Sequence, residues 1–221
     1  MTTARPHRVA PSGGEAQVAR ARLVVLASGA GTNLQAILDA TGDGRVDATV
    51  SAVVSNRRDA FALDRARAAG IPAHVITLRN GEARRSHDAR LLACVASYRP
   101  DWVILAGYMR LLTMDFLGPM SGRVVNLHPA LPGDLPGVDA IRRAYAEWQA
   151  GTRTHGGVMV HLVPDERVDA GPVLGEARVP LLAGDTLETF AERMHAAERA
   201  LLVSVVAGLA HAGNASTTEG T

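Results

Sequence analysis

Hydrophobic residues form short continuous runs that alternate with stretches of helical spacing along most of the chain. The run Leu23–Ala27 is followed by Ser and Gly, a pattern that indicates a strand buried on both faces. Other stretches repeat hydrophobic residues every three or four positions, as Leu91, Val95 and Tyr98 do, and this predicts helices. Such an alternation is typical of a parallel sheet covered by helices.

The order of these segments predicts a doubly wound α/β fold. The expected strands are residues 23–27, 48–54, 73–76, 102–106 and 123–126, and the expected helices are 33–40, 59–69 and 82–98. Residues 157–163 and 173–180 have the pattern of two further strands, antiparallel across a short acidic loop. A capping box at Asp185–Glu188 opens a final helix that is expected to reach about Leu209. We therefore predict a mostly parallel sheet with an antiparallel extension in the C-terminal half.

Composition narrows the class of protein and its partners. The chain has 221 residues, 47% of them hydrophobic and 20% charged, which suits a globular domain with a sizeable core. A net charge of +1 argues against nucleic acid as a partner, and no apolar run is long enough to span a membrane. The single cysteine, Cys94, allows no disulfide within the chain. We expect a cytoplasmic protein that acts on small molecules.

The two ends of the chain differ from its body. Residues 1–21 lack an apolar core segment, and the stretch at the other end is rich in Ser, Thr and Gly. We predict flexible tails at 1–21 and 211–221 around a single domain at 22–210.

A glycine-rich turn, Ala27–Asn33, separates the first strand from the first helix. Its glycines allow close approach of a ligand to the backbone, and the helix N-terminus offers free N–H groups to an anion. A P-loop would require a lysine before Thr32. A dinucleotide fingerprint would require a small residue in place of Leu34 and an acid where Ser55–Arg58 ends the second strand. The turn therefore favours a phosphomonoester as its ligand. The alternative is a turn that binds no ligand, in which glycine is present because the backbone geometry requires it.

Asn126 and His128 stand two residues apart at the end of a buried strand, which puts their side chains on the same side of the backbone. An amide donor and a titratable nitrogen suit a site where an oxyanion forms and a proton moves. Asp169, in a Gly-Pro turn downstream, is a carboxylate that would raise the pKa of His128 if it approached. The simpler alternatives are a structural His128 held by a backbone carbonyl and an Asp169 that serves an Asx-turn.

A metal site is a further alternative, because His155 and His161 could join His128. No paired ligand spacing supports it, so we expect no metal. His161 is interpreted as a core histidine or as a residue that supports the site.

Taken together, these motifs resemble those of the folate-dependent formyltransferases, and in particular of the phosphoribosylglycinamide formyltransferases. The matching segments are residues 26–35, 54–56, 105–110, 126–129 and 168–172. The resemblance implies a Rossmann-like formyltransferase fold and the transfer of a formyl group from 10-formyltetrahydrofolate, as co-substrate, to the amine of glycinamide ribonucleotide in purine biosynthesis. It also implies a phosphate- and nucleotide-binding half at 22–126 and a folate-binding and catalytic half at 127–210.

The resemblance assigns a role to each site residue. The catalytic residues would be Asn126, His128 and Asp169. The ribonucleotide and its phosphate would be bound by Gly31, Thr32, Asn33, His195 and Glu198. The folate would be bound by Arg84, Met109, Arg110, Leu111, Leu112 and Val163, with Arg85 as an equal candidate for the folate glutamate.

The chain departs from the family pattern in three places. Residues 129–133 read Pro-Ala-Leu-Pro-Gly in place of Pro-Ser-Leu-Leu-Pro, Met159 replaces a threonine, and the segment from His161 to Asp169 is one residue longer. The conformation of the longer loop is therefore open.

Three interpretations of function remain at this point, and the first is the phosphoribosylglycinamide formyltransferase described above. A related folate enzyme, either a formyltetrahydrofolate deformylase or a methionyl-tRNA formyltransferase, would share the catalytic motifs. A nucleotide-binding α/β module without catalysis would share only the fold. The sequence leaves open whether the protein is a monomer or a homodimer.

Overall fold

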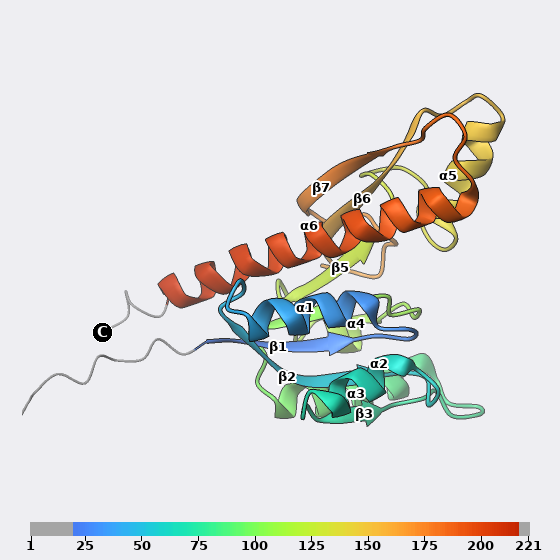
Figure 1. Ribbon diagram of the computed structural model, residues 1–221. Coiled ribbons are helices and arrows are strands. Elements are labelled where there is room, and N and C mark those ends of the chain that lie inside the picture. The colour runs from blue at the N-terminus through green and yellow to red at the C-terminus, as the bar shows by residue number, and fades with distance from the viewer. Residues whose placement is uncertain (1–19, 217–221) are drawn as a thin grey trace, which may run out of the picture.

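A seven-stranded sheet forms the centre of the computed structural model, which describes residues 20–216 (Figure 1). The strands are β1 (Ala21–Leu26), β2 (Ala48–Ser55), β3 (Ala73–Val75), β4 (Trp102–Leu105), β5 (Val124–His128), β6 (His155–Leu162) and β7 (Val173–Pro180). Their order is β3-β2-β1-β4-β5-β6-β7, in which β1 to β5 run parallel and β6 and β7 are antiparallel. This topology confirms the predicted sheet and its antiparallel extension.

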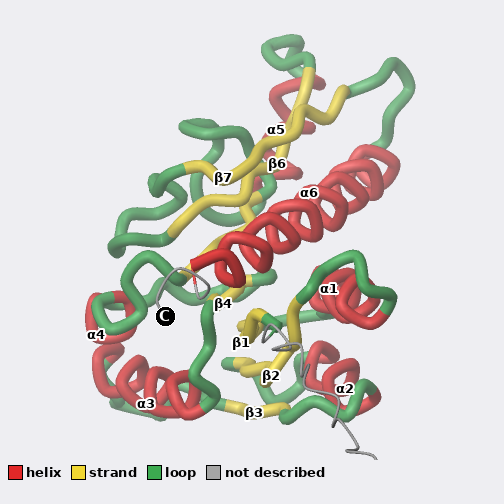
Figure 2. The backbone as a smooth tube through the Cα atoms, turned by 90° about the vertical axis from the view of Figure 1, so that its left-hand side faces the viewer, coloured by secondary structure: helices red, strands yellow, loops and turns green. Residues whose placement is uncertain are grey.

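Helices cover both faces of the sheet. They are α1 (Thr32–Gly42), α2 (Phe61–Ala68), α3 (Arg84–Ser97), α4 (Met114–Leu117), α5 (Ala140–Gln149) and α6 (Leu187–Ser216). Figure 2 shows α1 and α2 on one side of the first strands and α3 and α4 on the other. The long helix α6 crosses from the antiparallel strands to α1 (Figure 1). The fold is thus a helix–sheet–helix sandwich, which is how a parallel sheet buries both faces.

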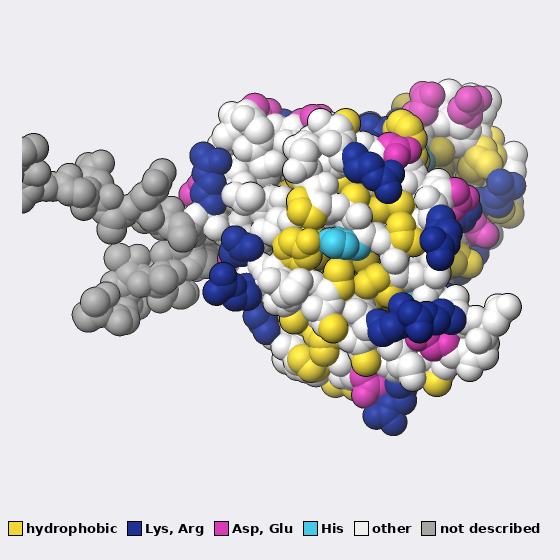
Figure 3. All heavy atoms as spheres, turned by 90° about the horizontal axis from the view of Figure 1, so that it is seen from below, with side chains coloured by type: hydrophobic (Ala, Val, Ile, Leu, Met, Phe, Trp, Pro, Cys, Tyr) yellow, Lys and Arg dark blue, Asp and Glu magenta, His cyan; other side chains and the backbone are white. Residues whose placement is uncertain are grey.

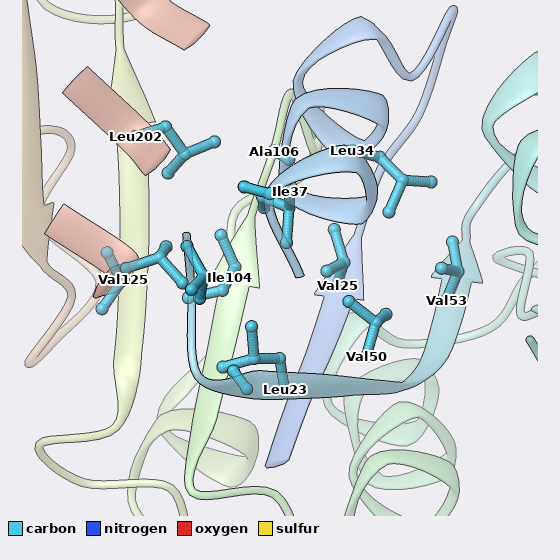
Figure 4. Packing of buried hydrophobic residues seen from close by; sticks show 14 of the residues in the cluster. Leu23, Val25, Leu34, Ile37, Val50, Val53, Ile104, Ala106, Val125 and Leu202 are labelled. Carbon is cyan, nitrogen blue, oxygen red and sulfur yellow. The ribbon is translucent and has the colours of Figure 1, made fainter. Parts of the chain in front are cut away.

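Alternation along the buried strands divides the core into two layers. Leu23 and Val25 point toward the layer that contains Ile37 of α1 and Leu202 of α6 (Figure 4). Val24 lies in the opposite layer, which is formed with α3 and α4. These side chains are fully buried, so the continuous apolar run of β1 follows from a strand that is covered on both faces.

Two helices in the structure are absent from the sequence-based expectation. The short α4 follows β4, and α5 follows the proline-rich loop after β5. Ala140 and Ala144 of α5 are buried, and Ala144 lies in the cluster that contains Phe190 of α6. The partly buried Ile141, Tyr145 and Trp148 pack against the same cluster. Ile141, Tyr145 and Trp148 have helical spacing, so the sequence does carry a signal for this helix, which the expectation above does not include.

The final helix also differs from the prediction at both ends. Its capping box is formed by Thr186 and Thr189, whose hydroxyls each accept the other's backbone N–H at 3.2 and 3.0 Å. Asp185 instead pairs with Arg193 at 2.8 Å. The helix continues to Ser216, so residues 211–216 extend it and do not begin a tail. At the other end, Ala21 of the predicted tail 1–21 begins β1. Residues 1–19 and 217–221 of the two predicted tails lie outside the described residues.

Acidic and basic side chains are interspersed on the surface. Figure 3 shows them scattered around hydrophobic side chains on the face that carries α2, α3 and β3, with no field of one sign. No helix among residues 20–216 is long and apolar enough to cross a membrane.

Candidate active site

The amide and imidazole side chains of the site both come from β5. Asn126 and His128 lie within the strand, which extends two residues beyond the predicted end, and the two-residue period directs them to one face. Antiparallel pairing sets His161 of β6 opposite Asn126 and sets Met159 opposite His128. The strand register thus brings a second histidine to the cluster.

A tight turn after β6 returns Asp169 to this cluster. Asp169 has a φ of 51°, in the left-handed region that Asp and Asn tolerate better than most residues. Gly171 is required two residues later, because a Cβ there would lie 1.8 Å from the carbonyl oxygen of Leu162. The turn therefore packs directly against the end of β6, which delivers the carboxylate to β5.

Short contacts connect the three predicted catalytic residues. Asn126 Nδ2 donates to Asp169 Oδ1 at 3.2 Å, and His128 Nδ1 lies 3.3 Å from Asp169 Oδ2. The backbone N–H of Gly137, in the proline-rich loop, also donates to Oδ2 at 2.9 Å. The structure thus brings the three residues into one cluster and adds a backbone donor that the sequence analysis did not identify.

His161 belongs to the same cluster. Its Nδ1 donates to the carbonyl of Leu162 at 2.8 Å, and its Nε2 lies 3.2 Å from Asn126 Nδ2. Nε2 also lies 3.5 Å from Asp169 Oδ1. The alternation of His161 along its strand left a core role open, and only the pairing with Asn126 identifies it as a support of the site.

Burial and charge act in opposite directions on His128. Desolvation is the largest influence and lowers the pKa of His128 below its usual value, although Asp169 attracts the proton. The predicted rise in the pKa of His128 is therefore wrong, because the cost of burying an imidazolium exceeds the attraction.

Asp169 remains ionised despite its burial. Desolvation opposes its charge, but the contact with His161, the Gly137 N–H and the attraction of His128 hold the pKa of Asp169 below its usual value. A buried carboxylate beside a mainly neutral imidazole is an arrangement suited to accepting or relaying a proton near neutral pH.

A cavity of about 430 Å³ opens over the cluster. Its walls contain Asn126, His128 and Asp169 together with five of the residues that were predicted to bind folate. Those five are Met109, Arg110, Leu111, Leu112 and Val163. Met109 and Leu111 are 69% and 52% exposed, so the cavity has an apolar rim that is open to a ligand.

The segment after β4 that forms the rim of the cavity is hydrogen-bonded to the glycine turn and to α3. Ser28 of the glycine turn accepts the N–H of Met109 at 2.8 Å, and Asp88 of α3 accepts the N–H of Thr113 at 2.7 Å. Arg84 lies at the start of α3, outside the cavity, and donates to the carbonyl of Leu111 at 3.1 Å. Arg85 is occupied by Asp115 at 2.6 Å.

The residues predicted for the phosphate lie outside this cavity. Gly31 begins α1 with a φ of 71° and no side-chain cap, which leaves the first N–H groups of the helix, at Thr32 and Asn33, to a ligand. On α6, His195 Nδ1 lies 2.6 Å from Glu198, and this contact raises the pKa of His195. Because α1 packs against α6, a cationic imidazole and a helix N-terminus occur on neighbouring elements.

No group of three or more His, Cys, Asp or Glu side chains that could hold a metal ion occurs among residues 20–216. The arrangement is that of an α/β enzyme whose polar cluster lies at the carboxyl ends of parallel strands. It combines donors for an oxyanion with an acid–base pair beside an apolar cavity.

Comparison with known proteins identifies the family. The formyl transferase family model matches residues 21–206. A phosphoribosylglycinamide formyltransferase of Escherichia coli is 41% identical over 85% of this chain and 86% of its own length, and one of Mycobacterium tuberculosis is 41% identical over 94% and 91%. A crystal structure of glycinamide ribonucleotide transformylase 1 from Symbiobacterium toebii superposes with a TM-score of 0.83 at 38% identity, over 91% of this chain and 94% of that one. The chain belongs to the formyl transferase family. It is a formyl-transferring enzyme, as the motifs in its sequence implied.

Proposed function

We propose that this enzyme transfers the formyl group of 10-formyltetrahydrofolate to the amine of glycinamide ribonucleotide, in the de novo synthesis of purines. The observation that carries the proposal is the contact of Asn126 and His128 with Asp169 in the wall of one apolar cavity. The acceptor substrate follows from relatives at 41% identity that are named phosphoribosylglycinamide formyltransferases.

The reaction needs no covalent bond to the enzyme in this mechanism. The amine nitrogen attacks the formyl carbon, a C–N bond forms, and the formyl oxygen takes the negative charge. Asn126 Nδ2 and a ring N–H of His128 donate to that oxygen. The bond from the formyl carbon to N10 of the folate then breaks, and N10 takes a proton while the former amine loses one. His128 and Asp169, directly or through a water, move these protons.

Both donors are already occupied in the ligand-free cluster. Asn126 Nδ2 contacts Asp169 and His161, and His128 Nε2 donates to the carbonyl of Leu135 at 3.1 Å. The substrate therefore exchanges these partners for the formyl oxygen. Once the formyl oxygen has replaced these partners, the two donors need little further reorganisation when the charge develops, which is the main source of oxyanion stabilisation.

The two substrates occupy different parts of the site in this proposal. The pterin of the folate lies against the exposed segment from Met109 to Leu112 and against Val163. Arg84 meets the glutamate end of the folate, because its guanidinium makes one backbone contact whereas Arg85 is paired with Asp115. The phosphate of the ribonucleotide binds at Gly31, Thr32 and Asn33. His195 and Glu198 bind the remainder of that substrate.

The direct test is an assay of purified enzyme with 10-formyltetrahydrofolate and glycinamide ribonucleotide. We expect formylated ribonucleotide and tetrahydrofolate to appear in equal amounts. Formate release at the same rate without the amine would instead identify a deformylase. Formylation of methionyl-tRNA in place of the ribonucleotide would identify the tRNA enzyme. Ligand binding without any turnover would identify a nucleotide-binding module without catalysis.

A further inference from the structure

The carbonyl oxygen of Leu135 accepts two side-chain hydrogen bonds beside the catalytic cluster. His128 Nε2 donates to it at 3.1 Å, and Nη2 of Arg143, from α5, donates at 2.8 Å. The same Nη2 donates to the carbonyl of Pro136 at 2.6 Å. One guanidinium group therefore fixes two successive carbonyls of the proline-rich loop.

The backbone at this point needs such support. Leu135 has a φ of 42°, in the left-handed region that side chains other than Gly, Asn and Asp rarely adopt. Nε of Arg143 is buried and has no hydrogen-bond partner within the described residues. A buried donor without a partner is unfavourable, so the guanidinium keeps this position because of its bonds to the two carbonyls.

Arg143 also acts on His128 through its charge. The groups that face the imidazole are Asp169 from the turn after β6, His161 from β6, Arg143 from α5 and the Leu135 carbonyl. Burial is the largest cause of the lowered pKa of His128, and repulsion from His161 and Arg143 lowers it further, against Asp169 and the carbonyl. Loss of the guanidinium would therefore favour the imidazolium.

We propose that Arg143 is a positioning residue for His128, which keeps the Leu135 carbonyl hydrogen-bonded when Nε2–H turns from that carbonyl to the formyl oxygen. This inference rests on the proposed function, because the formyl oxygen is what draws the N–H away. Without Arg143, this movement of Nε2–H would leave the part-buried carbonyl of Leu135 without a protein donor, and His128 would stay hydrogen-bonded to Leu135. Arg143 thus makes the carbonyl a temporary partner of the catalytic imidazole.

Three substitutions separate the charge of Arg143 from its hydrogen bonds. Arg143→Leu removes both, Arg143→Gln keeps a donor without the charge, and Arg143→Lys keeps the charge and a donor. Arg142→Gln is the matched control, because Arg142 is the exposed neighbour on the same helix. The pKa of His128 is measured by NMR titration of the ligand-free enzyme, with the His128 signal assigned from its absence in His128→Asn. Steady-state kinetics then give kcat for each variant.

We expect the pKa of His128 to rise in Arg143→Leu and Arg143→Gln and to stay at the wild-type value in Arg143→Lys and Arg142→Gln. We expect kcat to fall roughly five- to tenfold in Arg143→Leu, as the loss of one net hydrogen bond predicts, and less in Arg143→Gln. An unchanged pKa of His128 in a folded Arg143→Gln variant would overturn the inference. So would a kcat for Arg143→Leu equal to that of the control.

The titration needs no substrate, so its outcome is independent of the proposed function. A shifted pKa in a protein that transfers no formyl group would overturn the proposed function and the turn toward the formyl oxygen, and would leave only the electrostatic coupling. An active wild type with no shift in any variant would overturn the role of Arg143 and leave the proposed function intact.

Discussion

Asn126 Nδ2 donates to Asp169 Oδ1 across 3.2 Å, although 43 positions separate the two residues in the chain. The other carboxylate oxygen accepts the N–H of Gly137 and faces His128. Because each oxygen has its own partner, the carboxylate cannot rotate without losing a hydrogen bond. The amide and the backbone donor therefore fix the plane in which Asp169 meets the imidazole.

Replacement of Asn126 by Ala should lower kcat by about 10²- to 10³-fold, the usual effect of removing one oxyanion donor. The affinity for ribose 5-phosphate, a probe of the phosphate site alone, should stay near that of the wild type, because Asn126 lies in the cavity and not on α1. Steady-state kinetics and isothermal titration calorimetry measure the two effects. Asn80→Ala, in an exposed loop, serves as the control. Turnover within about twofold of the wild type would remove Asn126 from the catalytic residues.

Phosphate affinity should depend on the charge of His195. The contact with Glu198 raises the pKa of His195 above its ordinary 6.5, so the imidazolium is fully present below pH 6.5 and is lost as pH rises through the raised pKa. Above about pH 7 the phosphate is mainly a dianion, and its own titration no longer contributes. We expect the affinity for ribose 5-phosphate to fall with rising pH over this range.

The variant His195→Gln isolates that dependence. Its affinity for ribose 5-phosphate should be lower than that of the wild type near pH 7 and should change little at higher pH. His211→Gln, at an exposed position near the end of α6, should behave as the wild type does. If His195→Gln retained the full pH dependence of the wild type, the cation at the phosphate site would have to be another group.

Substitution of Gly31 by Ala should destabilise the protein and abolish the phosphate site. The new Cβ would lie 2.7 Å from the Cα of Ala62, and a φ of +71° is unfavourable for alanine. Gly44→Ala is the matched control, since Gly44 has a φ of +82° but nothing within 4 Å of the new Cβ. Both variants should lose about 1–2 kcal/mol of unfolding free energy from the backbone conformation.

The contact with Ala62 should cost Gly31→Ala about 1–3 kcal/mol more. Urea unfolding measures the difference, and calorimetry with ribose 5-phosphate should detect loss of affinity only in Gly31→Ala. Equal stability of the two variants would mean that α2 shifts at little cost to accommodate the new Cβ. Close packing against Ala62 would then not determine the conformation of the glycine turn.

The arrangement of the sheet could be predicted because its strands are apolar on both faces. Most of β1 appears in the sequence as an uninterrupted apolar run, Leu23–Leu26, and the glycine turn between β1 and α1 locates the first crossover. The helix α5 was not predicted, because it follows a loop rich in proline and glycine, although Ile141, Tyr145 and Trp148 repeat at helical spacing within it. These three side chains pack against the cluster that contains Phe190 of α6, which identifies them as the inward face of the helix.

The part of the candidate site that lies on one strand could be predicted from the local sequence pattern. Asn126 and His128 share a face because a strand has a two-residue period. The contributions of His161, Gly137 and Arg143 depend on strand register and on one loop conformation, neither of which follows from spacing. The pKa of His128 was predicted in the wrong direction for the same reason, because its burial becomes apparent only in three dimensions.

The kcat of Asp169→Asn with both substrates tests the central claim most directly. Asparagine tolerates the positive φ at this position, so the unfolding free energy should fall by no more than about 2 kcal/mol. Asp64→Asn, which removes a carboxylate from an exposed ion pair on α2, controls for loss of charge. We predict that kcat falls by about 10²-fold or more in Asp169→Asn and is unchanged in Asp64→Asn. A folded Asp169→Asn variant with turnover within about twofold of the wild type would contradict the account.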